Sequence, residues 1–534
     1  MGIYLNPGNE KFTSIARMEN YVDKTGMLRV INSFIDSGNK YICVSRPRRF
    51  GKTFAGNMLA AYYSKGCSSE GLFAGFKIAG EPTFAEKLNK YNVIKIDMNS
   101  EYQNTIEKGE LLRRLTREIV KEMKETFPTV VFEKNDSLAQ CILRVYAEKK
   151  ETFILLIDEY DVLVRETNVP PTLFAEYLSF LNGLFKSDTL WPAISLAYLT
   201  GILPVVRDKI QSKLNNFREY TILNAGLLSE YVGFTAEETE RLCHLHGMDD
   251  EECRRWYDGY HLKEFEIYNP ESVVRAVEDG EYGSYWGQTS SYEVISERIR
   301  QNFAGTKEAV VRMLAGEEVP VNVTRYLNTM TSFHTKDDLL TYLIHLGYLA
   351  YNRQEGTCRI PNREVRQEWF NAIETEEEYA VTNRIIQDSR ELLASTLSGD
   401  AEAVARALDV SHIHVTSNRS YNNEDALQSA IYLAYIYALN SYTVVREMTT
   451  GKGFADVVFI PVNPKNPAMI IEHKRNGCAE SALDQIRNKR YFSSLTNYLG
   501  NLLFVGINYD EKEKTHTCQM EMFVVDGEWK RFSC

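Results

Sequence analysis

The chain has 534 residues, of which 44% are apolar and 25% are charged. These fractions are typical of globular proteins and exclude wholesale disorder, and the length is enough for three or four domains. With 61 Lys and Arg against 73 Asp and Glu, the formal net charge is −12. That is the wrong sign for a protein that coats nucleic acid by bulk attraction, so any contact with nucleic acid must be local.

Cysteine usage and the lack of targeting signals bear on the compartment. The nine Cys are scattered without a CxxC pair, which argues against a disulfide framework and against a zinc ribbon. The N-terminal residues lack the basic region and apolar core of a signal peptide, and no apolar run is long enough to span a membrane. We expect a cytoplasmic protein with no membrane contact.

Changes in pattern predict three regions along the chain. Residues 1–225 alternate short apolar runs with helical stretches, which indicates a parallel sheet flanked by helices. Residues 226–375 are mainly helical and end in a helix followed by two short strands. That ending suggests a winged-helix-like module, which packs between domains or, as the alternative, reads DNA. Residues 376–534 begin with a charged helical connector and continue with alternating strands and helices.

A turn near the N-terminus has the pattern of a phosphate-binding loop. The strand at 41–45 runs into RPRRFGKTF, and Gly51, Lys52 and Thr53 open the next helical stretch. Backbone N–H groups and the helix dipole hold phosphates at such a corner. Lys52 would reach the β- and γ-phosphates and the Thr53 hydroxyl would bind Mg²⁺. The full pattern wants glycine where this chain has Arg46, so GKT by itself is equally compatible with a chance strand–turn–helix corner.

Two later strand ends support a nucleotide site. The apolar strand at 152–157 delivers Asp158 and Glu159 at its C-terminal end, where open α/β sheets place ligand chemistry. Asp158 can hold the magnesium ion and Glu159 can polarise the attacking water as a general base, although the pair alone also fits a solvated strand end. A further strand ends at Thr200, placed to sense the γ-phosphate. The ordered combination favours nucleotide binding.

Many short motifs over residues 15–290 occur together in one order: ENYVDKT, RPRRFGKT, LLIDEYD, LTGI, KLNNF, GFT-x-EE, WYDGY, YNPESV and YW-x-x-TS. In this the chain resembles the bacterial family of predicted AAA-like ATPases, which are of the additional-strand P-loop type and are fused to a PD-(D/E)xK nuclease-like domain. Arg46 is also what that family shows. The resemblance implies an ATP and Mg²⁺ site whose cofactor-binding residues are Arg46, Gly51, Lys52, Thr53, Asp158 and Thr200, with Glu159 catalytic.

A second constellation lies near the C-terminus. Glu472 and Lys474 are two apart on an apolar strand, so both side chains leave the same face of the sheet. A turn rich in Pro and Asn precedes that strand and can bring Asp456 beside Glu472. Two carboxylates suit Mg²⁺, and Lys474 can orient the attacking water and offset charge on a phosphodiester. The alternative is a set of ordinary charges at exposed strand ends.

This segment resembles the family's nuclease-like domain, whose hallmark is G-[RK]-x-D followed by a strand and E-x-K. Here Phe454 stands where a basic residue is usual, with Lys452 close by, and His473 stands between Glu and Lys; we expect its side chain to pack on the opposite face. The resemblance further points to acidic and polar contacts on the flanking helices, namely Glu424, Gln485 and Tyr491.

Weaker candidates lie elsewhere. Arg48 and Arg49 could contact phosphates or a neighbouring subunit or form a solvated turn, and Arg207 is a candidate γ-phosphate contact. A cluster of four Cys and His side chains does not have the spacing of a zinc site, which we do not expect. Its members are Cys243, His244, His246 and Cys253.

The predicted fold class is α/β: a P-loop NTPase parallel-sheet domain, a helical and winged-helix-like middle, and a C-terminal restriction-endonuclease-like domain. The predicted function is ATP binding and hydrolysis, coupled to Mg²⁺-dependent action on nucleic acid, with DNA the favoured partner and a homo-oligomer compatible with the sequence. The alternative is a nucleotide-dependent switch or scaffold whose nuclease-like domain binds without cleaving. Residues 441–534 carry 12 basic and 11 acidic side chains, a net charge of +1, so the acidity lies outside the nuclease-like region.

Overall fold

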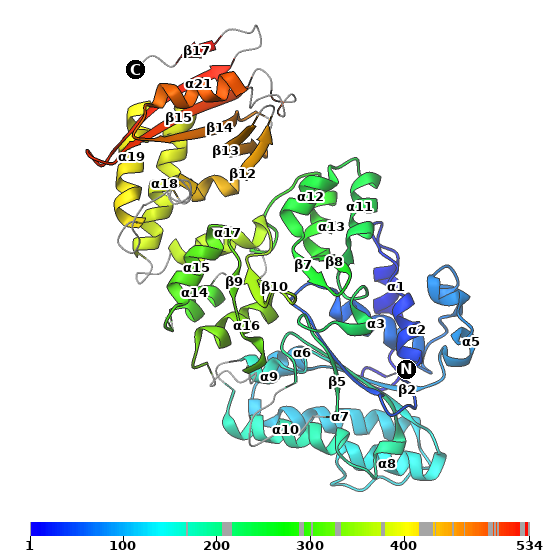
Figure 1. Cartoon of the computed structure of the whole chain (residues 1–534). Coiled ribbons are helices and arrows are strands. Elements are labelled where there is room, and N and C mark those ends of the chain that lie inside the picture. Colours follow the sequence, from blue (N-terminus) through cyan, green and yellow to red (C-terminus); the bar gives the residue numbers. More distant parts are fainter. Residues whose placement is uncertain are drawn as a thin grey trace. The chain divides into compact units, whose positions relative to one another are not determined.

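The computed structural model describes residues 2–166, 169–205, 216–287, 293–300, 303–325, 333–374, 380–415, 431–432, 434–450, 453–463, 465–489, 495, 498, 501–523 and 529–531. The chain divides into two compact units (Figure 1). The first unit comprises Met1–Ser291, Phe303–Gly305 and Glu318–Glu364, and the second comprises Tyr292–Asn302, Thr306–Glu317 and Val365–Cys534. The finer division into three regions stays a prediction.

A parallel five-stranded sheet forms the centre of the first unit. Its order is β2-β3-β4-β1-β5, so β4 is inserted between the strand of the phosphate loop and the strand of the Asp–Glu pair. This is the additional strand that the family resemblance implied. The strands are β1 (Tyr41–Ser45), β2 (Asn92–Asp97), β3 (Phe153–Asp158), β4 (Ile194–Gly201) and β5 (Arg218–Tyr220).

Every residue of β1, β3 and β4 is buried, because helices cover both faces of the sheet. One face packs on α7, α8 and α10, and α3 contacts the sheet from the other face (Figure 1). The helices of this part are α1 (Glu10–Ala16), α2 (Gly26–Asn32), α3 (Lys52–Tyr63), α4 (Glu70–Phe73), α5 (Phe84–Lys87), α6 (Met98–Asn104), α7 (Leu111–Thr126), α8 (Leu138–Lys149), α9 (Val162–Arg165) and α10 (Pro171–Phe185).

The remainder of the first unit is helical with two small sheets of order β6-β8-β7 and β10-β11-β9. The predicted helix followed by two short strands is confirmed by α16 and by the antiparallel pairing of β10 with β11. The elements are β6 (Phe234–Thr235), α11 (Ala236–Leu245), α12 (Asp250–Tyr257), β7 (Tyr260–Leu262), β8 (Phe265–Tyr268), α13 (Pro270–Asp279), β9 (Val319–Pro320), α16 (Lys336–Leu346), β10 (Ala350–Asn352) and β11 (Thr357–Arg359).

A six-stranded mixed sheet of order β12-β13-β14-β15-β16-β17 organises the second unit. The parallel pair β14 and β15 is joined through α21, as a crossover connection requires. The strands are β12 (Tyr442–Thr450), β13 (Gly453–Pro461), β14 (Ala468–Arg475), β15 (Leu502–Asp510), β16 (Thr515–Phe523) and β17 (Trp529–Arg531). The helices are α14 (Glu293–Ile299), α15 (Thr306–Leu314), α17 (Arg363–Glu374), which starts in the first unit, α18 (Ala380–Ser398), α19 (Ala401–Val415) and α21 (Ala479–Lys489).

Alternation along β14 separates the two faces of this sheet. Met469 and Ile471 pack with α18 and α19, whereas Ala468 and Ile470 pack with α21. Because side chains alternate along a strand, Glu472 and Lys474 fall on the α21 face. The fold class is therefore α/β in both units, as predicted. Within the described ranges, we find no helix with the length and apolar character needed to cross a membrane.

Candidate nucleotide-binding and nuclease-like sites

The turn between β1 and α3 has the backbone of a phosphate-binding corner. Gly51 precedes the helix with φ of 86°, a left-handed conformation that glycine adopts without strain, and Arg49 also has a positive φ of 68°. The helix then starts at Lys52, so its first backbone N–H groups open toward the turn. The left-handed conformation of Gly51 and the helix start at Lys52 therefore form the strand–turn–helix corner that the GKT motif predicted.

The Lys52 side chain folds back over this corner. Its Nζ donates to the carbonyl oxygens of Arg46, at 2.9 Å, and Pro47, at 2.7 Å. Burial lowers the pKa of Lys52 to about 8, although the carboxylates of Asp158 and Glu159 act in the opposite direction. The lysine is a buried cation whose partners are neutral carbonyls, which a phosphate group can replace.

Asp158 and Thr200 meet at the carboxyl edge of the sheet. Asp158 is the last residue of β3, and its carboxylate accepts hydrogen bonds from the Thr200 hydroxyl on the adjacent β4 and from the backbone N–H of Glu159. Both side chains are buried, with 5% and 1% of their residues' surfaces exposed. Thr53, the second residue of α3, is exposed.

Glu159 is held by an arginine that the sequence reasoning missed. Its backbone has φ of 47°, and its carboxylate forms an ion pair with Arg165, at 2.8 Å. Arg165 also pairs with Asp161, at 3.0 Å, and Asp161 accepts the backbone N–H groups of Ile202 and Leu203. The spacing of Asp161 and Arg165 at i and i+4 was the available signal.

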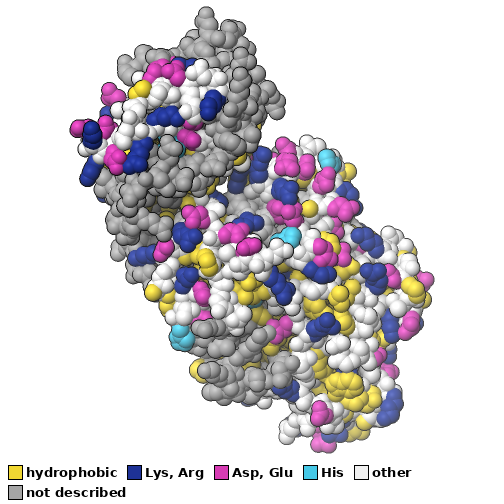
Figure 2. All heavy atoms as spheres, viewed as in Figure 1, with side chains coloured by type: hydrophobic (Ala, Val, Ile, Leu, Met, Phe, Trp, Pro, Cys, Tyr) yellow, Lys and Arg dark blue, Asp and Glu magenta, His cyan; other side chains and the backbone are white. Residues whose placement is uncertain are grey.

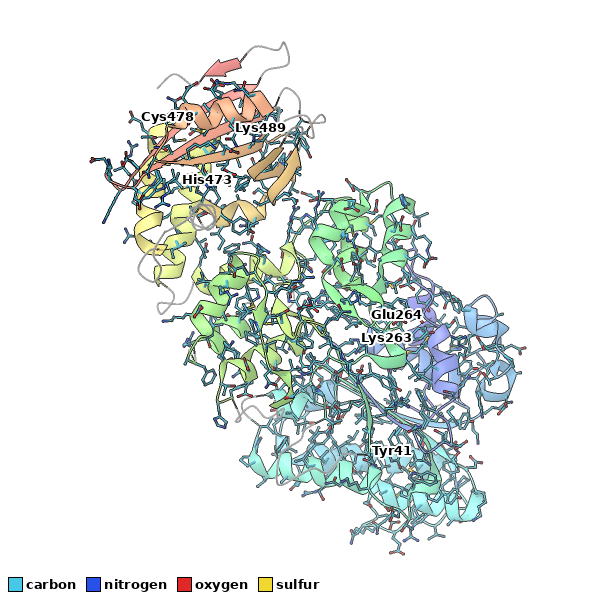
Figure 3. The ribbon with its side chains drawn as sticks, viewed as in Figure 1. Tyr41, Lys263, Glu264, His473, Cys478 and Lys489 are labelled. Atoms are coloured by element: carbon cyan, nitrogen blue, oxygen red, sulfur yellow. The ribbon has the colours of Figure 1, made fainter. Side chains whose placement is uncertain are left out.

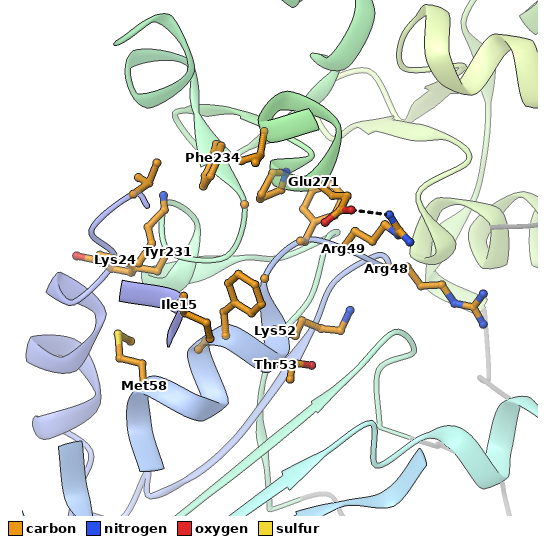
Figure 4. Close-up of a pocket in the computed structure, with 18 of the residues that line it drawn as sticks. Ile15, Lys24, Arg48, Arg49, Lys52, Thr53, Met58, Tyr231, Phe234 and Glu271 are labelled. Atoms are coloured by element: carbon orange, nitrogen blue, oxygen red, sulfur yellow. Dashed lines mark ion pairs between the residues drawn. The ribbon is translucent and has the colours of Figure 1, made fainter. Parts of the chain in front are cut away.

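A cavity of about 560 Å³ lies beside the corner, and Asp158 and Thr200 are not among the residues that line it (Figure 4). One end is lined by Gly51, Lys52 and Thr53 together with Glu159 and Arg165. The other end is lined mainly by apolar side chains from segments on both sides of the loop in sequence. Among them are Phe12, Ile15, Val22, Met58 and Phe234. The cavity thus offers one polar, cationic end and one apolar end, and the apolar lining was not predicted from the sequence.

Arg46, which we predicted to bind the cofactor, has its side chain within the fold. The guanidinium is fully buried and donates to the carbonyl oxygens of Ser45, Tyr220 and Leu228, and burial lowers its pKa to about 10. The backbone carbonyl of Arg46 accepts a hydrogen bond from Lys52 Nζ. In this conformation the Arg46 side chain joins the loop to β5 and does not line the cavity.

The neighbouring arginines and a second buried lysine complete the charges around the loop. Arg48 and Arg49 line the cavity, and Arg49 forms an ion pair with Glu271, at 3.0 Å, drawn in Figure 4. Lys95 on β2 donates to the Asn57 side chain on α3, and burial lowers its pKa to about 8. Arg207 lies outside the described residues.

In the second unit, Glu472 and Lys474 lie together on the α21 face, as predicted. Lys474 Nζ is 3.4 Å from Glu472 Oε1 and donates to Gln485 Oε1 on α21, at 2.5 Å. Gln485 in turn donates to Glu472. Glu472 is 1% exposed, and burial followed by the nearby Asp456 charge raises its pKa to about 7. These contacts make Gln485 a support for both charged side chains.

Asp456 lies just beyond the last register pair of β13 with β14, which joins Val457 to Ile471. Its carboxylate accepts the backbone N–H of His473, at 2.9 Å, and pairs with the His473 Nδ1 atom, at 2.7 Å. Our expectation that His473 only packs on the opposite face is wrong. The pairing of β13 with β14 ends here, so the Asp456 carboxylate accepts the His473 N–H in place of a carbonyl of the neighbouring strand. Figure 3 labels His473 in this sheet.

The residues present fit a divalent cation of the oxygen-preferring kind. Glu472 Oε2 is buried and has no hydrogen-bond partner among the described residues, a costly state for a carboxylate that a cation would relieve. Asp456 supplies a second carboxylate close enough to raise the Glu472 pKa. The described residues hold no cluster of three or more Cys, His, Asp or Glu side chains arranged for a metal. A cation here would therefore rest on the two carboxylates and on water.

Several other candidates can be placed. His244 pairs with Glu240 and His246 with Asn20, while Cys243 and Cys253 are buried, so the two imidazoles are engaged by other side chains. The side chains of Glu424, Lys452, Phe454 and Tyr491 lie outside what the structure describes. On the face drawn in Figure 2, Lys and Arg are interspersed with Asp and Glu.

Comparison with known families matches two regions of the chain. Residues 7–211 match the family model described as Predicted AAA-ATPase. Residues 422–518 match the model described as PD-(D/E)XK nuclease superfamily. The chain therefore contains one region similar to predicted AAA-ATPases and one region similar to the PD-(D/E)XK nuclease superfamily. The resemblance drawn from the motifs is confirmed: Gly51, Lys52 and Thr53 lie in the first matched region, and Asp456, Glu472 and Lys474 lie in the second.

Individual relatives add little about activity. The chain is 24% identical over 294 residues to an "Uncharacterized protein in vnfD 5'region" from Azotobacter chroococcum mcd 1, covering 54% of each chain. It thus spans about half the length of that curated relative. Among solved structures, the ORC2 protein of Aeropyrum pernix (ADPNP-ADP complexes) is 11% identical, covers 68% of this chain and 97% of its own, and gives a TM-score of 0.29, too low to support an argument.

Proposed function

We propose that the first unit binds and hydrolyses ATP. The observation that carries the proposal is the single cavity of about 560 Å³, with Lys52 and the α3 N-terminus at one end and apolar side chains at the other. A nucleotide is complementary to this cavity, because its phosphates are anionic and its base is flat and weakly polar. Helix N-termini and lysines of this kind hold phosphates.

The residues have distinct roles in this proposal. Lys52 leaves the Arg46 and Pro47 carbonyls and binds the β- and γ-phosphates. Thr53 and Asp158 would hold Mg²⁺, which neutralises charge on the phosphates when bound. Glu159 orients and deprotonates the attacking water, and Thr200 keeps Asp158 in position through its hydrogen bond.

We further propose that the second unit acts on nucleic acid, with DNA favoured. Asp456 and Glu472 would hold a Mg²⁺ ion, which supplies Lewis-acid chemistry at a phosphodiester. Lys474, held by Gln485, offsets charge on the phosphate. The supporting observation is the buried Glu472 oxygen that lacks a partner among the described residues. ATP turnover in the first unit would control this activity within one chain.

A second candidate function is a switch or scaffold whose nuclease-like unit binds nucleic acid without cutting it. The observation in its favour is that Asp456 is engaged by His473 and Lys474 by Gln485. Both groups must be released or shared before they can act on a phosphodiester. In addition, Phe454 stands where the family pattern has a basic residue.

A cleavage assay separates the two functions. Wild-type protein and Glu472→Ala are incubated with DNA and RNA substrates, with and without ATP, in the presence of Mg²⁺ or Mn²⁺. Cleavage that requires Glu472 supports the nuclease, whereas binding without cleavage in both proteins supports the scaffold. Cleavage that persists in Glu472→Ala contradicts the assignment of this site.

The ATPase is tested independently with Lys52→Ala. Loss of the phosphate-binding lysine is expected to reduce ATP hydrolysis by roughly a hundredfold or more, since it removes charge stabilisation at the transferring phosphate. Lys65→Ala is the matched control, because Lys65 pairs with Glu151 at the surface. Equal hydrolysis by wild type and Lys52→Ala would contradict the proposed site.

A further inference from the structure

Arg165 occupies a central place in the cavity wall of the first unit. Its side chain is only 8% exposed and lines the cavity with Lys52 and Glu159. Its two ion pairs use different nitrogen atoms: Nε faces Asp161, at 3.0 Å, and one terminal nitrogen faces Glu159, at 2.8 Å. The guanidinium is thus fixed at its inner end and bonded to Glu159 at its outer end.

The two carboxylates differ in how firmly they are held. Asp161 is fully buried and accepts the backbone N–H groups of Ile202 and Leu203 beyond β4, so it is anchored to the sheet. Glu159 has a side chain that is 33% exposed and lines the cavity. An anion that enters the cavity therefore competes for Arg165 with Glu159 and not with Asp161.

ATP would supply that anion. Guanidinium groups bind phosphate oxygens strongly and with two parallel bonds. The charges of Arg165 and Glu159 act on Lys52, which places all three groups within electrostatic range of one another. A γ-phosphate near Lys52 would lie within the same field, and ADP lacks this group.

We infer that Arg165 binds the γ-phosphate of ATP and that Glu159 holds this arginine when the site is empty. The inference rests on the proposed ATP site and adds a residue to it. Arrival of the γ-phosphate draws the terminal nitrogen of Arg165 away, and Glu159 becomes free to orient water. The general base is therefore released only when a triphosphate is present.

A purely structural role for Arg165 makes a different prediction. If Arg165 only fastens α9 to the end of β4 through Asp161, its loss changes stability but does not distinguish ATP from ADP. Selectivity between the two nucleotides is the readout that a structural role would not alter.

The test measures ATP and ADP affinities, in the presence of Mg²⁺, for wild-type protein and for Arg165→Gln. We expect ATP affinity to fall about tenfold or more, as loss of a charged hydrogen bond predicts, with ADP affinity within about twofold of wild type. Arg165→Lys should recover part of the preference for ATP. Equal losses for ATP and ADP, or no loss, would overturn the inference.

A second variant keeps the test valid if Arg165→Gln folds poorly. Glu159→Gln leaves Arg165 in place and removes its competitor, so ATP affinity should rise severalfold while ADP affinity stays unchanged. The rise should disappear in the double variant Glu159→Gln/Arg165→Gln, because the two residues are coupled. An unchanged ratio of ATP to ADP affinity in Glu159→Gln would overturn the inference.

Failure of the inference is distinguishable from failure of the ATP site itself. Wild-type protein that binds neither nucleotide, or Lys52→Ala that binds both normally, refutes the proposed function. Wild-type protein that binds both, with a ratio that is insensitive to Arg165, refutes only the role of Arg165.

Discussion

The two sites of this chain are opposite in charge and in how their charged groups are satisfied. In the first unit, Lys52 and Arg165 line a cavity and are bonded within the protein, to carbonyl groups and to carboxylates. In the second, Glu472 is buried with one oxygen that has no partner among the described residues. The first site has cations whose partners an anion can replace, whereas the second has a carboxylate that a cation would complete.

This difference predicts how each site responds to its ligand. Ligand binding at the first site exchanges hydrogen bonds within the protein for hydrogen bonds to phosphate. Substitutions at this site should therefore mainly change the selectivity between nucleotides. Cation binding at the second site adds bonds that the protein itself lacks, so loss of one carboxylate should remove binding altogether.

The largest effect is expected for Glu472→Ala in the second unit. Removal of the buried carboxylate should abolish binding of Mn²⁺ or Mg²⁺ measured by calorimetry on the full chain without nucleotide, since hard cations need oxygen ligands. Glu513→Gln, an exposed carboxylate between β15 and β16, is the control and should leave binding unchanged. Retained metal binding by Glu472→Ala would show that the comparison between the sites is wrong.

A smaller loss at the same site is expected for His473→Ala. The imidazole bonds the Asp456 carboxylate, and loss of a side chain that orients a metal ligand lowers metal affinity by about ten- to a hundredfold. His473→Gln, which can still donate to Asp456, should restore part of the affinity. Thermal unfolding of each variant is followed in parallel, and an affinity that does not respond to His473 would contradict its positioning role.

The first site should instead respond to pH through Lys52. Burial lowers the pKa of Lys52 to about 8, so the lysine loses its proton above that pH. Because phosphates favour the charged form, ATP affinity should be constant below pH 8 and should fall by up to about tenfold per pH unit above it. Lys52→Arg, which stays charged, should not show the fall. An identical pH profile for both proteins would contradict this assignment.

The smallest effect concerns the backbone of the phosphate corner. Gly51 has φ of 86° and open space around the position of a Cβ atom, so Gly51→Ala should cost only backbone strain, about 1–2 kcal/mol in urea unfolding. Gly56→Ala is the matched control, because Gly56 lies inside α3 with equally open space and without a positive φ. This control should stabilise the protein by roughly 0.5–1 kcal/mol. The same sign for both variants would contradict the requirement for glycine at the corner.

Local patterns in the sequence predicted much of this molecule. The run at 41–45 is β1, the run 194–201 is β4, and the apolar strand before Asp158 is β3, because a continuous apolar run flanked by polar residues fits a strand buried on both faces. The charged helical connector predicted at the start of residues 376–534 appears as α18 and α19. The period of two also placed Glu472 and Lys474 on one face of β14.

The sequence alone thus determined the order of the elements and the residues at the carboxyl ends of the strands, because both depend on neighbours a few positions away. The tertiary structure decided which partners those residues have. It buried Arg46 under the loop, paired Arg165 with Glu159, joined His473 to Asp456 and assembled the apolar end of the cavity from distant segments. These contacts depend on strand order, helix packing and the divergence of two strands, which no local pattern specifies.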